Sequence, residues 1–336
     1  MFFFKKKCIL TAAVFFAVSS VLCAKNFSFS VIPYFNIETS VIEEAYYYED
    51  YSKYADRMCS LLEWEEKPSF AFGLESIFNL NKFVFSLDFS AKIPMRSGSM
   101  LDSDYWTDGM KFNYSINENY LDKGFSAKTG FAYSFNFSVF SFKPLIQFSY
   151  SFISFNAKNG YGWYGGSAHS SDGNVHSWDS PYAHYYPDGK YHLAGVDYEN
   201  QTFSILTGFD FSKVLFEKWR TGIGFLVAPF TYVYAKDHHL GKSSNFYSED
   251  FIYIWFKNFQ VNLKNDFIIS ERFSVNSVLE GNFILLTKGK NHRNGELNQQ
   301  QGGFSYKGFK ATVGFCVSFE KENLAFGLKT RFTIEN

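Results

Sequence analysis

The chain has few cysteines, and this scarcity excludes one class of small secreted protein. There are four cysteines among 336 residues, and two of them lie within the first 24 residues. Only Cys59 and Cys316 remain beyond that segment, far apart in sequence. Two distant cysteines do not make a disulfide framework, and a bridge between them cannot be assumed.

Long apolar runs and basic clusters are also missing. Beyond the N-terminus, no uninterrupted apolar stretch approaches the roughly 20 residues that a membrane helix needs. The formal net charge is −1, and it becomes −4 if the three lysines of the N-terminal segment are removed. A weakly acidic chain without a basic run is a poor candidate for a nucleic-acid partner.

The N-terminal segment has the three parts of a signal peptide. MFFFKKK supplies the positive region, CILTAAVFFAVSSVL the apolar core, and Leu22-Cys23-Ala24 a cleavage site before Lys25. Cys23 raises the alternative of a lipid-anchored cysteine, although Leu22 is bulkier than such sites usually accept. We therefore expect a signal peptide over residues 1–24 and an exported mature chain.

Aromatic residues, by contrast, are abundant. They make up 21% of the chain, with 43 Phe and 23 Tyr, yet the mean hydropathy is slightly negative. A soluble core of this size would use more Leu, Ile and Val and fewer rings. In FVFSLDFSAKI (83–93) the odd positions are apolar and the even positions polar. This alternation suits a strand that faces lipid on one side and a polar lumen on the other.

The same alternation recurs, and it predicts an all-β fold, a transmembrane antiparallel up-and-down β-barrel of about ten strands with long extracellular loops. Short turns such as NLNK (79–82) and a long polar loop at roughly 159–192 are typical of such barrels. A secreted β-sandwich also alternates, but the ring content and long strands favour the barrel. The segments are about 26–40, 66–80, 83–93, 125–137, 138–157, 200–212, 219–235, 250–268, 272–287, 304–319 and 324–334.

The last of these segments complicates the count of strands. Ten strands can be argued up to Phe319, and 324–334 then has the pattern of an eleventh. Bacterial single-chain barrels have even strand numbers. We therefore expect a barrel with an extracellular active-site cleft over 25–320, followed by a C-terminal tail or extra strand over 321–336.

Two short motifs more than a hundred residues apart each follow a predicted strand. SGSMLDSDYW (97–106) carries Asp102 and Asp104, and AKDHH (235–239) carries Asp237 and His239. Residues i and i+2 of a strand share a face, and parity turns all four side chains toward the lumen. Three carboxylates and an imidazole would then meet at one mouth, where they could activate a water. Taken alone, either motif is more often a solvated loop carboxylate or a surface histidine.

The motifs resemble those of the omptin family, outer-membrane endopeptidases built as ten-stranded barrels. Met-x-Asp-x-Asp followed by an aromatic matches Met100 to Tyr105, and Asp-x-His matches Asp237 to His239. The resemblance covers most of the mature chain. It implies an aspartic-type endopeptidase in the outer membrane whose active site faces outside. In this scheme Asp237 orients His239, which takes the proton of a water as the water attacks a peptide carbonyl.

The resemblance also implies an acidic pocket for a basic substrate residue. Its first wall is best matched by Glu44, with Glu43 the alternative, and strand parity favours Glu44. The alternative for Glu44 is a solvated charge. The family's second wall is an Asp two residues before the dyad, where this chain has Ala235. That departure weakens the electrostatic case for strict cleavage beside Arg or Lys.

Three further residues match the family's binding sites. Met100 corresponds to an apolar groove residue, Asp108 to a second acidic subsite, and Lys158 to one of the basic residues that clamp lipopolysaccharide. The expected partners are extracellular polypeptides and outer-membrane lipid, and the expected state is a monomer. Because only Lys158 matches among the family's basic residues, the question whether lipopolysaccharide activates the protein stays open.

No cofactor is expected. Four histidines lie in or beside the long loop, but none has zinc-ligand spacing with a partner. They are His169, His176, His184 and His192. The alternative function is non-enzymatic: a small pore, a transporter or an adhesin on the same scaffold, for which Ala235 leaves room. A ten-stranded lumen is largely filled by side chains, which argues against a wide pore.

Overall fold

The computed structural model describes residues 27–48, 53–54, 56–187, 195–240 and 246–320. The predicted signal peptide, His192 and the tail 321–336 with its eleventh strand lie outside the described residues. No helix long and apolar enough to cross a membrane is found in the part of the chain that is described.

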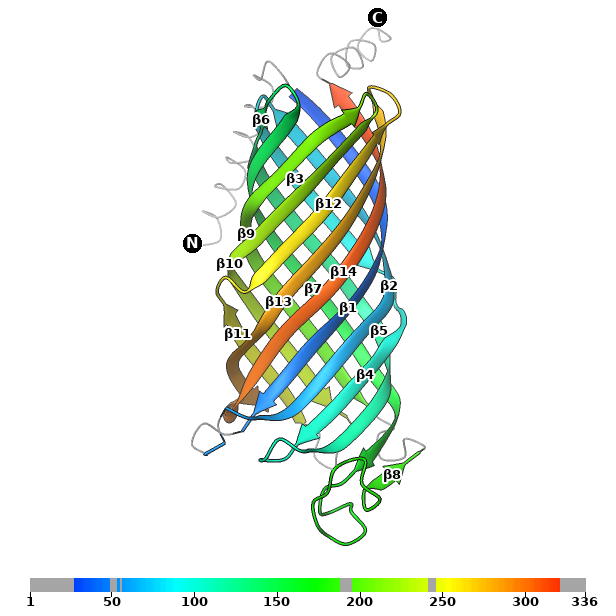
Figure 1. Ribbon diagram of the computed structural model, residues 1–336, viewed down its shortest axis with the longest axis vertical. Helices are drawn as coiled ribbons and strands as arrows, with labels where there is room; N and C mark the ends of the chain where they lie inside the picture. Colours follow the sequence, from blue (N-terminus) through cyan, green and yellow to red (C-terminus); the bar gives the residue numbers. More distant parts are fainter. Residues whose placement is uncertain (1–26, 49–52, 55, 188–194, 241–245, 321–336) are drawn as a thin grey trace, which may run out of the picture.

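The fold is a single sheet of antiparallel strands that closes on itself (Figure 1). β1 and β14 pair antiparallel along most of their length, and this pairing seals the barrel. The strands are β1 (Phe27–Tyr47), β2 (Met58–Leu80), β3 (Phe83–Lys92), β4 (Met95–Tyr105), β5 (Lys111–Tyr133), β6 (Phe135–Asn136), β7 (Phe140–Tyr164), β8 (His184–Tyr186), β9 (Val196–Phe216), β10 (Trp219–His239), β11 (Phe246–Ile254), β12 (Asn258–Ile268), β13 (Phe273–Arg293) and β14 (Glu296–Glu320).

Two of the ring's strands are each split into two pieces. β3 and β4 both pair with β2 on one side and β5 on the other. β11 and β12 likewise both pair with β10 and β13. β6 and β8 are short additions that pair with β7. The ring therefore has about ten strands, which confirms the predicted fold class and strand number.

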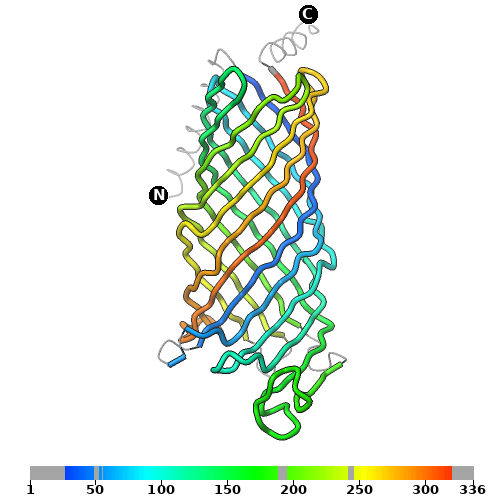
Figure 2. The backbone as a smooth tube through the Cα atoms, viewed as in Figure 1, coloured from blue at the N-terminus to red at the C-terminus, as the bar shows by residue number. Residues whose placement is uncertain are grey.

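The strands are strongly tilted, and the two ends of the barrel differ (Figure 2). At one end the connections β2–β3, β9–β10 and β12–β13 are short. At the other end lies the lobe that carries β8, at the bottom of Figures 1 and 2. The ends of β4 and β10 that hold the two motifs lie on this second side.

The strands extend farther toward the motif end than the alternation predicts. β2 begins at Met58 and β5 at Lys111, instead of about 66 and 125. The expectation that both motifs lie just beyond their strands is therefore wrong, because they lie inside β4 and β10. The reason is that the outer wall here faces water rather than lipid. The backbone pairing of the strands therefore continues beyond the last apolar outward residues, where the alternation in the sequence has ended.

Residues on the outside of the wall mark this change. Large exposed hydrophobic side chains form the lipid-facing band, among them Phe35, Phe72, Phe89, Phe125, Ile223, Leu263, Leu279 and Phe309. Toward the motif end, outward positions of β1, β2, β9, β10 and β11 carry Glu43, Glu63, Glu199, Lys236 and Glu249 instead. Placing a charged side chain against the hydrocarbon of a membrane costs free energy. The motif end therefore stands clear of the membrane.

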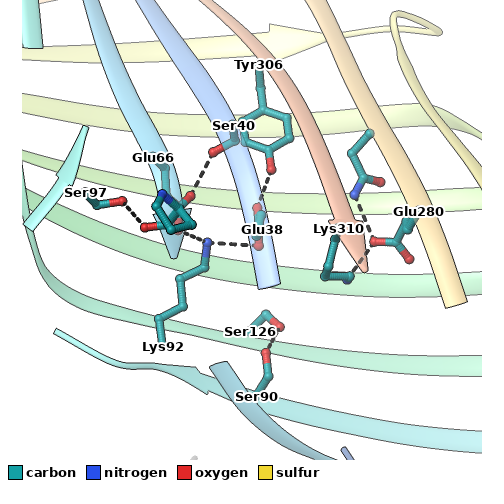
Figure 3. Close-up of polar contacts among 12 residues, drawn as sticks. Glu38, Ser40, Glu66, Ser90, Lys92, Ser97, Ser126, Glu280, Tyr306 and Lys310 are labelled. Carbon is teal, nitrogen blue, oxygen red and sulfur yellow. Dashed lines mark hydrogen bonds and ion pairs between the residues drawn. The ribbon is translucent and has the colours of Figure 1, made fainter. Parts of the chain in front are cut away.

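Polar side chains on the inner face of the barrel contact one another (Figure 3). Lys92 forms ion pairs with Glu38, at 3.0 Å, and with Glu66. The Tyr306 hydroxyl donates to Glu38 Oε1 at 2.6 Å, and Lys310 pairs with Glu280 at 2.7 Å. These contacts connect β3, β2, β1, β14 and β13, which follow one another around the ring.

Candidate functional site

The first motif points into the lumen even though a bulge precedes it. Gly98 has a positive φ of 78°, and the β4–β5 register shifts between Arg96 and Ser99. Beyond the bulge, Met100 is buried in the core of the barrel. Asp102 lies between Leu62 of β2 and Ser115 of β5, both of which are buried. Asp102 therefore faces inward as predicted, but not through an unbroken register: Arg96 faces outward, and the bulge at Gly98 returns the even positions to the lumen.

The carboxyl groups of this motif have neighbours on the adjacent strands. Asn113 Nδ2 donates a hydrogen bond to Asp104 Oδ2 at 3.0 Å. Burial, and after it the negative charge of Asp102, raise the pKa of Tyr164 on β7. Asp102 and Asp104 therefore share an acidic, partly enclosed corner with a tyrosine.

The second motif is an Asp–His dyad at the end of β10. Thr231, Val233, Ala235 and Asp237 are all buried on the lumen face. His239 Nε2 lies 2.6 Å from Asp237 Oδ2, and 13% of the His239 side chain is exposed. The imidazole also stacks on Phe246, with ring centroids 4.4 Å apart. Asp237 and Phe246 thus fix the ring while leaving it open to solvent.

Tyr46 of β1 joins the dyad to the opposite wall. Its hydroxyl lies 2.8 Å from Glu44 Oε1 and 3.0 Å from Asp237 Oδ1. A hydroxyl has one proton, so it donates to one carboxyl group and accepts from the other. Burial, and then the charges of Asp237 and Asp250, raise the pKa of Glu44 well above its ordinary value. Tyr46 thus lies within hydrogen-bond distance of both carboxyl groups and connects β1 to β10.

The two motifs meet through β1 and β2. Glu44, Leu62 and Asp102 are successive cross-strand partners on β1, β2 and β4. Strands in a sheet lie about 4.8 Å apart, so Asp102 is about 10 Å from Glu44 along the wall. Because Tyr46 links Glu44 to Asp237, a chain of contacts runs from the wall that carries Asp102 to the wall that carries the dyad.

A cluster of stacked rings lies inside the barrel beside the two motifs. Trp64 of β2, the cross-strand partner of Met100, stacks on Tyr198 with centroids 4.8 Å apart. It also stacks on Phe155 of β7 at 6.0 Å. Tyr198 is in turn the cross-strand partner of Asp237. The rings thus span the lumen between the two motif-bearing walls.

Asp250 is a site residue that sequence reasoning missed. It is the cross-strand partner of Ala235, and it is 1% exposed. Asn291 Nδ2 donates to Asp250 Oδ1 at 2.7 Å. Burial raises the pKa of Asp250 to about 8, and the nearby charge of Asp237 adds to the effect. In the sequence, only the alternation along the strand indicates Asp250, since it places this residue on the same face as Ile252 and Ile254.

The candidate substrate-binding residues differ in placement. Glu44 is buried and inward, whereas Glu43 faces outward and pairs with Lys307 at 2.9 Å. Met100 is buried beside Trp64 rather than exposed in a groove. Asp108 is exposed between β4 and β5, where it accepts a hydrogen bond from the Met110 backbone N–H at 2.9 Å. The roles of these residues stay predictions.

Lys158 lies on the outer wall, where its ammonium group sits 4.2 Å from the centroid of the Tyr120 ring. On the same wall Arg96 pairs with Glu118 at 3.1 Å. The role of Lys158 in binding lipid stays a prediction.

The described loop histidines have local partners. His169 and His184 contact Tyr186, and His176 pairs with Asp172 at 2.8 Å. Across the described ranges, no three His, Cys, Asp or Glu side chains are grouped as metal ligands would be. The absence of a metal requirement stays a prediction.

Comparison with known proteins gives a likeness in fold. No protein-family model and no curated protein matches the chain. The structure is similar to the outer membrane protease OmpT from Escherichia coli, with a TM-score of 0.74, 14% sequence identity, and coverage of 88% of this chain and 98% of that one. OprG from Pseudomonas aeruginosa, at 10% identity, covers 88% of this chain and 97% of its own, with a TM-score of only 0.33. The chain therefore has the fold of a bacterial outer-membrane β-barrel, similar to that of OmpT.

Proposed function

We propose that the chain is an outer-membrane endopeptidase that hydrolyses extracellular polypeptides near basic residues. The observation that carries this proposal is the 2.6 Å contact between His239 and Asp237 on a wall that Tyr46 connects to the wall of Asp102. An Asp–His dyad opposite a second carboxylate is suited to general-base catalysis when a water binds between them.

In the proposed mechanism, Asp102 and His239 hold one water between them. The water oxygen attacks the peptide carbonyl carbon while its proton passes to the imidazole, and Asp237 stabilises the imidazolium that results. Nε2 already faces Asp237, so Nδ1 takes the proton. When the C–N bond breaks, the imidazolium returns that proton to the leaving amine. Asp104, held by Asn113, supports Asp102.

The ring layer below the cleft favours a closed site over a channel. Trp64, Phe155 and Tyr198 are all buried and stacked across the lumen. A cavity of about 910 Å³ lies in the other half of the barrel, and neither catalytic pair lines it. A substrate entering from the motif end would thus meet the dyad and then a wall of rings. Because the motif end projects beyond the lipid-facing band, we place this cleft outside the cell.

Two substitutions test the proposal in a refolded, membrane-inserted barrel. We expect His239→Ala and Asp102→Asn each to lower kcat/KM for an arginine-containing fluorogenic peptide by about 10²–10⁴-fold. Matched controls are His238→Ala, the outward neighbour, and Asp122→Asn, an exposed carboxyl on β5. Wild-type turnover in either catalytic variant would reject the proposed chemistry.

A further inference from the structure

Three buried carboxyl groups from three strands gather beside the dyad. Glu44 of β1, Asp237 of β10 and Asp250 of β11 are each at most 1% exposed. The Tyr46 hydroxyl lies 2.8 Å from Glu44 Oε1 and 3.0 Å from Asp237 Oδ1. Burial raises the pKa of Tyr46, and the charges of Asp237, Glu44 and Asp250 raise it further. The region is much more acidic than the dyad alone requires.

Asp250 occupies the place next to the alanine where the family resemblance implies an acid. Ala235 and Asp250 are directly opposite each other in the β10–β11 ladder, so their side chains project from the same face about 5 Å apart. The small side chain of Ala235 leaves the neighbouring carboxyl room. A negative charge absent from β10 is thus supplied by β11.

The wall between Asp250 and Tyr46 is shaped around the Asp250 carboxyl group. Gly302 of β14 is the cross-strand partner of Tyr46. A Cβ added at Gly302 would lie 1.9 Å from Asp250 Oδ1. The absence of a side chain at this position is therefore what makes room for the Asp250 carboxyl group against β14, beside the strand that carries Tyr46 and Glu44.

Three buried oxygens in this cluster make no hydrogen bond to the described residues: Oδ2 of Asp250, Oε2 of Glu44 and Oδ2 of Asp237. Asp237 Oδ2 faces His239 Nε2 at 2.6 Å, which leaves Asp250 Oδ2 and Glu44 Oε2 unsatisfied. The indole N–H of Trp64 is near enough to favour the ionised form of Glu44, but it makes no hydrogen bond of normal geometry. Unsatisfied buried carboxylate oxygens are costly. A cationic ligand with several N–H groups would satisfy both.

We propose that Asp250 and Glu44 together form the pocket that binds the guanidinium or ammonium group of a substrate residue, with Asp250 as its specificity-determining acid. This inference rests on the proposed endopeptidase activity and assigns the acid that Ala235 does not provide. Burial raises the pKa of both carboxyl groups, and an incoming cation would favour their ionised forms.

The test compares two peptides that differ only in arginine or citrulline at the residue before the cut bond. Citrulline keeps the size and most N–H donors of arginine but lacks its charge. We expect Asp250→Asn and Glu44→Gln each to lower the arginine-to-citrulline ratio of kcat/KM at least tenfold. The double variant Ala235→Asp with Asp250→Asn should recover part of that ratio. The outward neighbours Glu249→Gln and Glu43→Gln are the matched controls and should keep the wild-type ratio.

Binding of the same peptides, labelled for fluorescence polarisation, separates this inference from the proposed activity. A wild-type preference for the arginine peptide that Asp250→Asn loses, without any cleavage, would support the pocket and reject the endopeptidase. Cleavage by a folded Asp250→Asn barrel at the wild-type arginine-to-citrulline ratio would overturn the pocket and leave the endopeptidase standing.

Discussion

Tyr46 reaches across the lumen to Asp237, with its hydroxyl oxygen 3.0 Å from Asp237 Oδ1. The same hydroxyl lies 2.8 Å from Glu44 Oε1. The proposed cation pocket and the dyad therefore share one hydrogen-bonding group.

Removal of this hydroxyl should slow cleavage. Hydrogen bonds to charged groups contribute about 1.5–3 kcal/mol. We therefore expect Tyr46→Phe to lower kcat/KM for the arginine peptide about ten- to a hundredfold. Tyr47→Phe, on the opposite face of β1, is the control. Equal rates for Tyr46→Phe and the wild-type chain would show that Tyr46 does not position Asp237.

The raised pKa of Asp250 predicts a pH-dependent cost to stability. An unfolded Asp carboxyl group releases its proton near pH 4, whereas the folded one holds it until about pH 8. The folded chain binds more protons over this window, so the wild-type chain loses stability as the pH rises through it. The variant Asp250→Asn lacks this titration, because asparagine has no ionisable group. The wild-type chain and the variant share the titratable groups around position 250, which are Glu44, Asp237, Tyr46 and Tyr198.

Urea unfolding in lipid vesicles would measure this effect. The free energy of unfolding of Asp250→Asn, relative to wild type, should increase from pH 5 to pH 8. A difference that stays constant over this range would mean that Asp250 is already ionised in the folded barrel.

The ring layer should contribute substantially to stability. Trp64 is fully buried between Tyr198 and Phe155. Truncation of a buried Trp to Ala costs about 3–5 kcal/mol, and we expect Trp64→Ala to fall in that range. Trp106 is 42% exposed, and its single edge contact predicts a loss of about 1 kcal/mol for Trp106→Ala. Equal losses in urea unfolding would contradict a packed layer around Trp64.

Cleavage should not require a metal. The proposed water is held by carboxylates and an imidazole, and no metal-ligand group is present among the residues that the structure describes. We expect a chelator to leave peptide turnover within about twofold of its starting value, since no step in the general-base scheme uses a metal. Loss of turnover that zinc restores would reject this expectation.

The alternation of rings and polar residues was enough to predict the barrel, because lipid and lumen impose opposite demands on successive residues. Parity also predicted that Asp102 faces inward, although the bulge at Gly98 breaks the register that this prediction assumed. The alternation did not predict the extensions of β2 and β5. Beyond the lipid, both the outer and the inner face of the barrel can carry polar residues, so the alternation ends there. There the strands are held by backbone pairing that leaves little trace in the sequence.

The acidic cluster was only partly predictable. Glu44 and the dyad followed from strand parity and short motifs. The pairing of Asp250 with Ala235 depends on the register between β10 and β11, and the contact of Tyr46 with Asp237 depends on the narrowness of the lumen. Both are relations across space that no local spacing encodes.

A double-mutant cycle on Asp102 and His239 tests the central claim most directly. If the two residues hold one water, each single substitution already disables the site, and the double variant should lose about as much kcat/KM as the more damaging single variant. If the residues act apart, the two single losses should multiply in the double variant. That second result, measured in folded barrels with the arginine peptide, would contradict a shared catalytic water.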